Sequence, residues 1–476
     1  MRYKRIKSLC GAVILACLTA VSAPGFAANE AMLDLLKILR DKGSITQEEY
    51  ELLVNAAKSD AEVVEDVKTR MEARVKDIPK IDTKGKLKIT SSDGDFEWQP
   101  IGRIMADYSW IHSDKNKLGS GAEIRRARLG MEGLMWKHWI WKLELDFADA
   151  EVAMKDAYIG YKDGNWWIKA GQQHIPFGFA TLSSSKYMLF TERPFLADGT
   201  LQLARHLGVA AFTHGASKRW TLHGGIFAGP DGEDPDVCLT GFDECDEQWS
   251  VAARGTFLPW MQDDSHLVNI GGAVWYRDPL DSEVRVRQRP GIWHVVDDRF
   301  VDANFGVNGV GRPFGADDIL AFNAEALLVY GPFSLGGEYA RWDVNTEPAP
   351  SGATPPDDAS LDGYYVEAAY FLTGESMVFK TSKAQYDKVK PKGIVGKGGI
   401  GAWQVAARYD AIDLNDADAG LTGGEMRGVA FGLNWYVTEN MRMMASFYRI
   451  LETDRFGNRF DDDEPYGLTV RGQVFW

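Results

Sequence analysis

The stretch that decides the fold is YGLTVRGQVFW, residues 466–476. Its apolar side chains fall at every second position, from Tyr466 through Leu468 to Trp476, and Arg471 lies on the alternate positions. Successive side chains of a β-strand point to opposite faces, so this period of two predicts a strand with one apolar face and one polar face. We expect the aromatic residue at the C-terminal end of this strand, Trp476, to be recognised by the machinery that assembles β-barrels.

The same alternation recurs from about residue 96 onward, where the period of the apolar residues changes from 3.6 to 2. Sixteen segments with this pattern are predicted. They are 96–110, 123–135, 139–148, 153–161, 165–171, 205–213, 219–228, 247–257, 266–277, 318–330, 333–342, 362–372, 402–412, 427–437, 441–451 and 466–476. One parity is apolar or aromatic and the other carries charge.

Two folds fit this alternation, a soluble sandwich with a dry core and a barrel with lipid outside and water inside. The connections favour the barrel, because short links such as Lys137-His138 and Gly331-Pro332 alternate with long polar loops. We therefore predict an all-β protein, a 16-stranded antiparallel transmembrane β-barrel over residues 85–476. Because the number of strands is even, the first strand begins and the last strand ends on the same side of the membrane, which is the periplasmic side. The basic segment 373–401 fits least well and is predicted to be a long periplasmic turn.

The N-terminus predicts export. Four basic residues precede the apolar run Leu9 to Ala20, and small residues at Gly25 and Ala27 offer a cleavage site, so residues 1–27 are predicted to be a signal peptide. A membrane anchor is the first alternative, although the run is short for a bilayer. A lipoprotein site at Cys17 is the second. Export through such a signal agrees with localisation in the outer membrane of a Gram-negative bacterium.

Residues 28–80 are predicted to form a periplasmic helical segment. Leucines at helical spacing precede a break at Lys42-Gly43, and Thr46 with Glu49 makes a capping box for a second helix. Apolar residues at helical spacing continue through the highly charged stretch 59–78. That stretch is either a short coiled coil or a solvated helical linker.

Charge and cysteines exclude several functions. The chain carries a net charge of −15, and removal of residues 1–27 leaves 49 basic and 68 acidic residues, a net of −19. This acidity argues against nucleic acid as a partner. Cys238 and Cys245 remain in the exported chain, and their spacing predicts a small loop disulfide rather than a metal site. No enzyme motif stands out, so no catalytic residue, cofactor or metal is predicted.

The third long loop, residues 172–204, differs from the other loops in being less acidic. It contains Pro176-Phe177-Gly178-Phe179 and three consecutive serines, Ser183 to Ser185. A barrel of about 16 strands encloses a wide lumen. We expect this loop to fold inward and narrow that lumen; the alternative is a lid that lies outside.

Cations on the lumen side predict an anion pathway, because rings of Arg and Lys lower the barrier for anions in a narrow pore. The predicted pore-lining residues are Arg103, Arg126, Arg128, Lys142, Lys169, Lys186, Arg193, Arg205, Arg254 and Arg408. Acidic residues such as Glu132, Glu144 and Asp410 share the same face. The alternative is therefore a wall of mixed charge that is merely solvated, or that sets a transverse field.

Several stretches resemble the phosphate-selective porin O/P family. They are Arg125-Arg126-Ala127-Arg128-Leu129, Lys155-Asp156-Ala157-Tyr158-Ile159-Gly160-Tyr161, Gly171-Gln172 followed by Ile175-Pro176-Phe177-Gly178, Glu192-Arg193, Asp298-Arg299-Phe300-Val301-Asp302, Gly331-Pro332-Phe333-Ser334-Leu335, Gly401-Ala402-Trp403 and Ala407-Arg408-Tyr409. The resemblance covers roughly residues 85–476, and it lies in the order and spacing of these stretches rather than in any single motif.

The resemblance implies a homotrimer of 16-stranded barrels in outer-membrane lipid, each with an inward third loop. It further implies passive diffusion of small anionic solutes such as phosphate, with Arg126, Arg128, Lys142 and the third-loop cations as the carried-over residues. Here the pore parity and the outer loops are rich in acids, which departs from phosphate-specific members. A structural or adhesive barrel, plugged by its third loop and tethered by its helices, is the alternative function.

Overall fold

The computed structural model describes residues 25–76, 78–83, 85–197, 199–228, 249–279, 282–292, 298–306, 314–348 and 357–476. The chain divides into two compact units at Lys80/Ile81. Most of the predicted signal peptide, 1–27, and the predicted disulfide between Cys238 and Cys245 lie outside the described residues.

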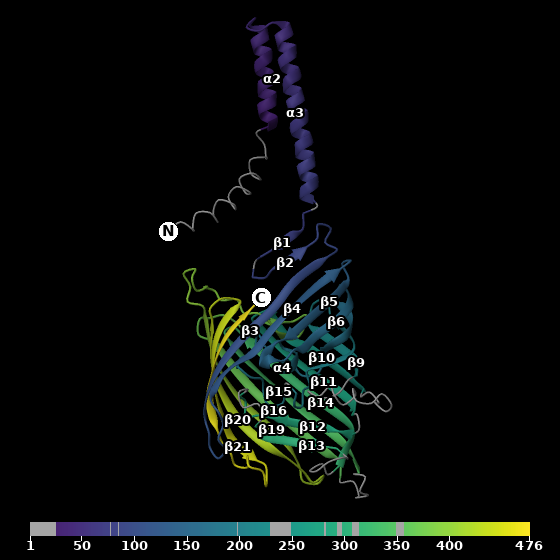
Figure 1. The fold of residues 1–476 in the computed structure, drawn as a ribbon, viewed down its shortest axis with the longest axis vertical. Coiled ribbons are helices and arrows are strands. Elements are labelled where there is room, and N and C mark those ends of the chain that lie inside the picture. Colours follow the sequence, from purple (N-terminus) through teal and green to yellow (C-terminus); the bar gives the residue numbers. More distant parts are fainter. Residues whose placement is uncertain are drawn as a thin grey trace. The chain divides into compact units, whose positions relative to one another are not determined.

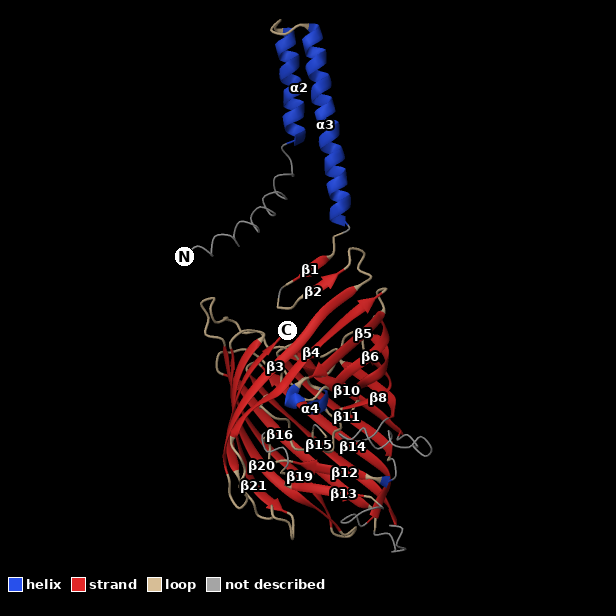
Figure 2. Ribbon diagram, in the orientation of Figure 1, coloured by secondary structure: helices blue, strands red, loops and turns tan. Residues whose placement is uncertain are grey.

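The N-terminal unit is a helical hairpin of α2 (Gly25–Asp41) and α3 (Gln47–Lys76), shown in Figure 2. The predicted capping box is present, since Thr46 N donates to Glu49 Oε2 at 2.8 Å and Glu49 N donates to Thr46 Oγ1 at 3.2 Å. Leu36 and Ala57 pack in the interface between the helices and are buried. Across the described ranges, no helix combines the length and apolarity that a membrane crossing demands.

The second unit is a closed antiparallel barrel (Figure 1). Within the described ranges its sixteen strands are β3 (Glu97–His112), β4 (Gly121–Met135), β5 (Trp139–Asp146), β6 (Ala153–Asp163), β7 (Trp166–His174), β8 (Arg205–His214), β9 (Trp220–Ala228), β10 (Trp249–Asp263), β11 (His266–Asp278), β14 (Phe314–Tyr330), β15 (Phe333–Pro348), β16 (Ala359–Phe371), β19 (Ala402–Asp416), β20 (Leu421–Tyr436), β21 (Met441–Asp454) and β22 (Tyr466–Phe475). The sixteen predicted segments correspond to these strands one by one, so the fold prediction is confirmed.

The barrel closes where β22 pairs with β3, in the register Leu468 opposite Trp110. Trp476 extends this seam, because its backbone exchanges two hydrogen bonds with Gly102, of 3.1 and 3.3 Å. Two short strands, β1 (Lys80–Asp82) and β2 (Lys88–Thr90), join the sheet beside β3. The short turns lie at the end where β3 begins, which is the periplasmic end in an outer-membrane barrel.

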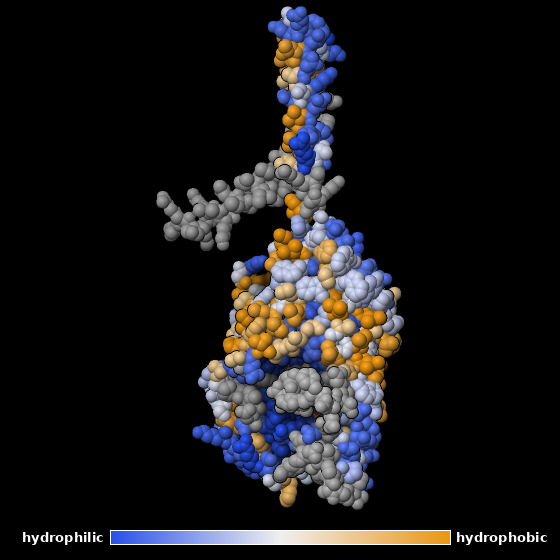
Figure 3. All heavy atoms as spheres, turned by 45° about the vertical axis from the view of Figure 1, so that its right-hand side comes forward, coloured by the Kyte–Doolittle hydropathy of each residue, from blue (hydrophilic) through white to orange (hydrophobic). Residues whose placement is uncertain are grey.

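The outer face of the wall is apolar, as the alternation predicts. Ile159 and Ile226 keep 60% and 62% of their surface exposed, which suits a wall that faces lipid. The space-filling view shows such residues gathered over the outer face of the strands, with hydrophilic residues toward the long loops (Figure 3).

The inner face carries apolar residues as well as the charged ones that the alternation predicts. On β14 to β20 it also carries buried apolar residues, among them Ile319, Trp342 and Ile412. These pack in one core with Phe190 and Leu201 of the third loop. Apolar residues are favourable on this part of the inner face because the third loop folds into the lumen, covers the wall there and excludes water from it.

Two hairpins within the long connections were not predicted. One, β12 (Val284–Gln288) with β13 (Val301–Phe305), packs on the inner side of the wall against β20. A Cβ at Gly423 of β20 would come within 2.7 Å of the Ala303 side chain, so this glycine lets the hairpin approach closely. The other, β17 (Phe379–Lys380) with β18 (Gln385–Tyr386), belongs to segment 373–401.

Candidate functional site: the lumen constriction

The third loop lies inside the barrel, as predicted. Its short helix α4 (Phe179–Leu182) is held by Glu338 of β15, which accepts hydrogen bonds from the backbone N–H groups of Phe179 and Ala180. On other sides of the lumen, Asn434 of β20 donates to Leu189 O at 2.9 Å. The loop therefore spans the lumen and is hydrogen-bonded to strands on different sides of the barrel.

A buried ion network fixes the middle of the loop. Glu192 receives two hydrogen bonds of 2.9 Å from Arg125 of β4, and Arg471 of β22 contacts the same carboxylate at 3.0 Å. Arg471 also pairs with Asp107 through two hydrogen bonds. Burial alone would raise the pKa of the Glu192 carboxyl, but the charges of Arg125, Arg126 and Arg471 lower that pKa to about 2.

Segment 373–401 enters the lumen from the opposite, periplasmic end. Arg254 of β10 donates to Ala384 O at 3.0 Å and thereby holds the β17–β18 hairpin. The hairpin reaches the third loop, since Tyr386 N donates to Ser183 Oγ at 3.3 Å and the rings of Tyr386 and Phe179 meet edge-to-face at 4.7 Å. Two segments from opposite ends of the barrel thus meet in its interior.

Most of the ten predicted cations point inward but have compensating partners. Carboxylate partners are found for Arg103 with Glu144, Arg128 with Asp146, Lys142 and Arg205 with Asp156, Arg254 with Glu325, and Arg408 with Asp410, all between 2.5 and 2.9 Å. Arg193 donates to the carbonyls of Ala180, Thr181 and Ser183, and Arg126 is buried beside Met105. These arginines connect wall strands and inward segments to one another.

Three lysines differ from those arginines. Lys169 of β7, Lys186 of the third loop and Lys383 of the β17–β18 hairpin have no carboxylate within ion-pair distance among the residues described here. Lys169 instead lies 4.2 Å from the Tyr158 ring centroid and 4.0 Å from that of Trp167, and Lys186 lies 5.6 Å from the ring of Tyr187. Electrons of an aromatic face attract a cation without neutralising it.

All three lysines lie near Lys142, and Lys169 also lies near Lys383. Lys169 interacts electrostatically with Lys383 and with Lys142, while Lys186 and Lys383 each interact with Lys142 and with Glu132. We call Lys142, Lys169, Lys186 and Lys383 the lysine cluster. Its members come from two wall strands, the third loop and the periplasmic hairpin. Acidic neighbours share the same space, namely Glu132, Glu144, Asp156 and Asp387.

The surroundings of the cluster lower the pKa values of Lys186 and Lys383, its two members outside the wall strands. Burial, reinforced by the charge of Arg103, lowers the pKa of Lys186 to about 8. Burial and Lys380 likewise lower the pKa of Lys383, although its side chain keeps contact with water. A lysine that is surrounded by protein, still wet and close to other cations is placed to meet an anion that passes through the lumen.

Lys383 is the residue that the sequence reasoning missed. The signal was the basic composition of 373–401, which contains six lysines, but that segment was predicted only to be a long periplasmic turn. Nothing local in the sequence indicates that a turn re-enters the barrel.

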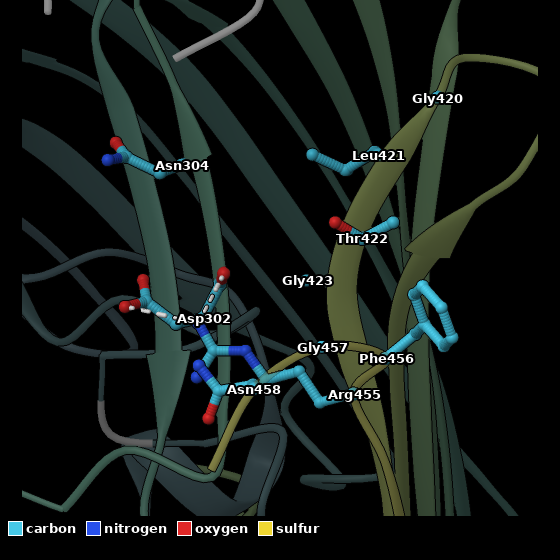
Figure 4. A pocket seen from close by; sticks show the side chains of 10 residues that line it. All are labelled: Asp302, Asn304, Gly420, Leu421, Thr422, Gly423, Arg455, Phe456, Gly457 and Asn458. Carbon is cyan, nitrogen blue, oxygen red and sulfur yellow. Dashed lines mark hydrogen bonds and ion pairs between the residues drawn. The ribbon is translucent and has the colours of Figure 1, made fainter. Parts of the chain in front are cut away.

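A separate cavity of about 480 Å³ opens near the long-loop end. Figure 4 shows Asp302 and Asn304 of β13 on one side and Leu421 and Thr422 of β20 on the other, with Arg455 between them. Arg455 donates to Arg299 O at 3.0 Å, so it fastens the β12–β13 hairpin. The cavity thus lies between the β12–β13 hairpin and the wall at β20. Over the described ranges no group of His, Cys, Asp or Glu is arranged to hold a metal ion.

A closed barrel of sixteen antiparallel strands, with an apolar outer wall and a lumen narrowed by an inward loop, defines an outer-membrane channel of the porin class. The chain belongs to the family described as phosphate-selective porin O and P, whose model matches residues 101–476. It is accordingly an outer-membrane porin of a Gram-negative bacterium and a channel rather than an enzyme.

The relatives agree with this assignment. The chain is 28% identical to Porin O of Pseudomonas aeruginosa over 424 residues, which cover 83% of this chain and 91% of that protein. It is also 28% identical to an uncharacterized protein of Caulobacter vibrioides over 410 residues, 82% of this chain and 75% of that one. Among solved structures, the trimer form of OmpT, an outer membrane protein of Vibrio cholerae, shares the fold with a TM-score of 0.50 at 13% identity, over 80% of this chain and 99% of that chain.

Proposed function

We propose that the protein is an anion-selective porin that passes small oxyanions such as phosphate, and that the lysine cluster sets this selectivity. The observation that carries the proposal is that Lys169, Lys186 and Lys383 each interact electrostatically with Lys142, and that none of the three has a carboxylate within ion-pair distance among the described residues. Cations that are not held in an ion pair attract anions and repel other cations in a narrow, water-filled passage.

The chemistry of lysine suits passage. An ammonium group is a compact, hydrated point charge on a flexible stem, so it can follow a moving anion, whereas an arginine fork holds a carboxylate in a fixed geometry. In this lumen most of the predicted arginines are engaged by acids or carbonyls. A doubly charged oxyanion would interact with two or three lysines at once, which favours phosphate over chloride within the cluster.

The proposal includes assembly as a homotrimer in outer-membrane lipid. It is supported by the family membership and by the trimer form in which OmpT of Vibrio cholerae was solved. Arg103, Arg126, Arg128, Arg193, Arg205, Arg254 and Arg408 stay predicted pore-lining residues, with the further role of holding the inward segments in place.

Single-channel recording across a planar bilayer tests the proposal. We expect an anion-selective reversal potential in a KCl gradient, and a chloride current that falls when phosphate is added. Lys383→Glu should shift the reversal potential toward cation selectivity. Lys397→Glu, an exposed lysine of the same segment, is the matched control and should leave it unchanged. Cation selectivity in the parent protein would overturn the proposal, and absence of conductance would favour the plugged structural barrel.

A further inference from the structure

The helical hairpin leaves an apolar row without a partner. Val64, Val67 and Met71 of α3 keep 60%, 49% and 60% of their surface exposed, and Leu53 nearer the start of the helix is also exposed. Figure 3 shows apolar side chains along one edge of the helical segment and hydrophilic ones along the rest. Exposed valines and methionines in aqueous surroundings indicate a surface that something covers.

The hairpin itself covers only part of this row. α2 has 17 residues and α3 has 30, and α2 packs antiparallel on the first half of α3, where Ala57 is buried. In the described part of the chain, the second half of α3 therefore extends beyond the helix that covers its start. Val64, Val67 and Met71 all lie in that extension.

The spacing of the row identifies the kind of partner. Leu53, Ala57, Asp60, Val64, Val67 and Met71 follow one another at intervals of four, three, four, three and four residues. This is a repeat of 3.5 residues, the period at which identical helices bury a common seam by winding around each other. A coiled-coil heptad has two core positions, a and d, and β-branched residues at both favour three helices over two. Val64 and Val67 occupy one position of each kind.

Charge does not oppose association of copies here. The chain as a whole has a net charge of −15, but residues 58–76 contain five basic and five acidic side chains. Two of the acids pair within the helix, Glu65 with Lys68 at 3.7 Å and Asp66 with Arg70 at 3.0 Å. Copies of this segment can approach without the repulsion that the remainder of the chain would produce.

We propose that the α3 helices of three copies of this chain form a parallel coiled coil, with Val64, Val67 and Met71 in its core. The inference rests on the proposed trimer of barrels. Barrels in one membrane insert with the same orientation, so their helices start from the same side and present identical residues at the same height. Asp60 is the polar member of the seam, and it limits the stability of the bundle.

Cysteine cross-linking in the full chain tests the seam. In a Cys238→Ser/Cys245→Ser background, Val67→Cys places a thiol in the proposed core, and Thr69→Cys places one on the opposite, exposed face as a matched control. After mild oxidation of the detergent-solubilised protein, we expect disulfide-linked dimers from Val67→Cys and at least tenfold fewer from Thr69→Cys. Asp60→Leu should raise the temperature at which these helices separate.

A mass measurement of the detergent complex keeps the two proposals distinguishable. A trimeric mass with no Val67→Cys cross-link, or with equal cross-linking at both positions, would overturn the coiled coil and leave the trimer of barrels intact. A monomeric mass together with no cross-link would overturn both. Val67→Asp provides a second check, because it should abolish helix association while the conductance of the barrel is retained.

Discussion

Arg125 and Glu192 join a wall strand to the third loop through two parallel hydrogen bonds of 2.9 Å, and both side chains are buried. A fork of this kind fixes orientation as well as distance. The position of the loop in the lumen thus depends on an ion pair between residues 67 positions apart.

Arg125→Ala should release the third loop. Removal of one partner of a buried pair leaves the other charge uncompensated, at a cost of about 3–5 kcal/mol. We expect a larger and noisier single-channel conductance. Arg285→Ala, which breaks an exposed two-point pair with Asp302, is the control and should leave the conductance of the constriction unaltered. An unchanged, quiet current in Arg125→Ala would show that other contacts suffice.

Acid should weaken the same attachment. The pKa of Glu192 is near its ordinary value of 4.5 in the unfolded chain and about 2 in the folded one. Its contribution to stability is therefore complete above pH 4.5 and is lost as the pH falls toward 2. Thermal unfolding of the parent should shift downward across that window, while Glu192→Gln should be less stable at neutral pH and less sensitive to acid. Parallel curves for the two proteins would contradict this role.

Alkali should weaken anion selectivity. The pKa of Lys186 is lowered to about 8, so this lysine is charged below that pH and neutral above it. The ratio of anion to cation permeability, taken from reversal potentials, should fall between about pH 7 and about pH 9, which spans one unit on each side. In Lys186→Arg the guanidinium stays protonated, so the fall in the ratio over this range should be smaller than in the parent. A fall of equal size in that variant would assign the titration to another group.

Arg254→Ala should loosen the periplasmic hairpin. The substitution removes two hydrogen bonds to Glu325, of 2.8 and 2.6 Å, and the bond to Ala384 O. We expect trypsin to cleave after Lys380 or Lys383 at least tenfold faster in the solubilised variant. Arg341→Ala breaks an exposed pair with Asp343 and should digest like the parent. Equal digestion of both variants would mean that contacts other than those of Arg254 hold the segment in place.

Gly423→Val should displace the β12–β13 hairpin from the wall. The new side chain would overlap Ala303 and the carbonyl of Leu414, and overpacking of this kind costs about 1–3 kcal/mol. Ala303→Cys, buried in the parent, should then react with a maleimide when the other cysteines are absent. Gly119→Val serves as the control, because a Cβ there meets nothing within 4 Å. A thiol that stays protected would show that the hairpin tolerates the larger residue.

The sequence allowed the wall to be predicted because lipid imposes a period of two on every strand and loop length distinguishes the two ends. The lumen could not be predicted in the same way. Arg254 and Glu325 pair across 71 residues, and Trp342 points inward because a distant loop covers it. The alternation predicts which face of a strand a cation lies on, but whether that cation is paired depends on such remote partners.

The contact between Ser183 and Tyr386 brings together segments that enter the barrel from opposite sides of the membrane. Neither segment faces lipid, so each can change in sequence without disturbing the hydrophobic belt that keeps the protein inserted. The same passage is therefore shaped by two segments that lie outside that belt, one entering from the environment side and one from the cell side. Solute preference can diverge between relatives whose membrane-facing surfaces remain interchangeable.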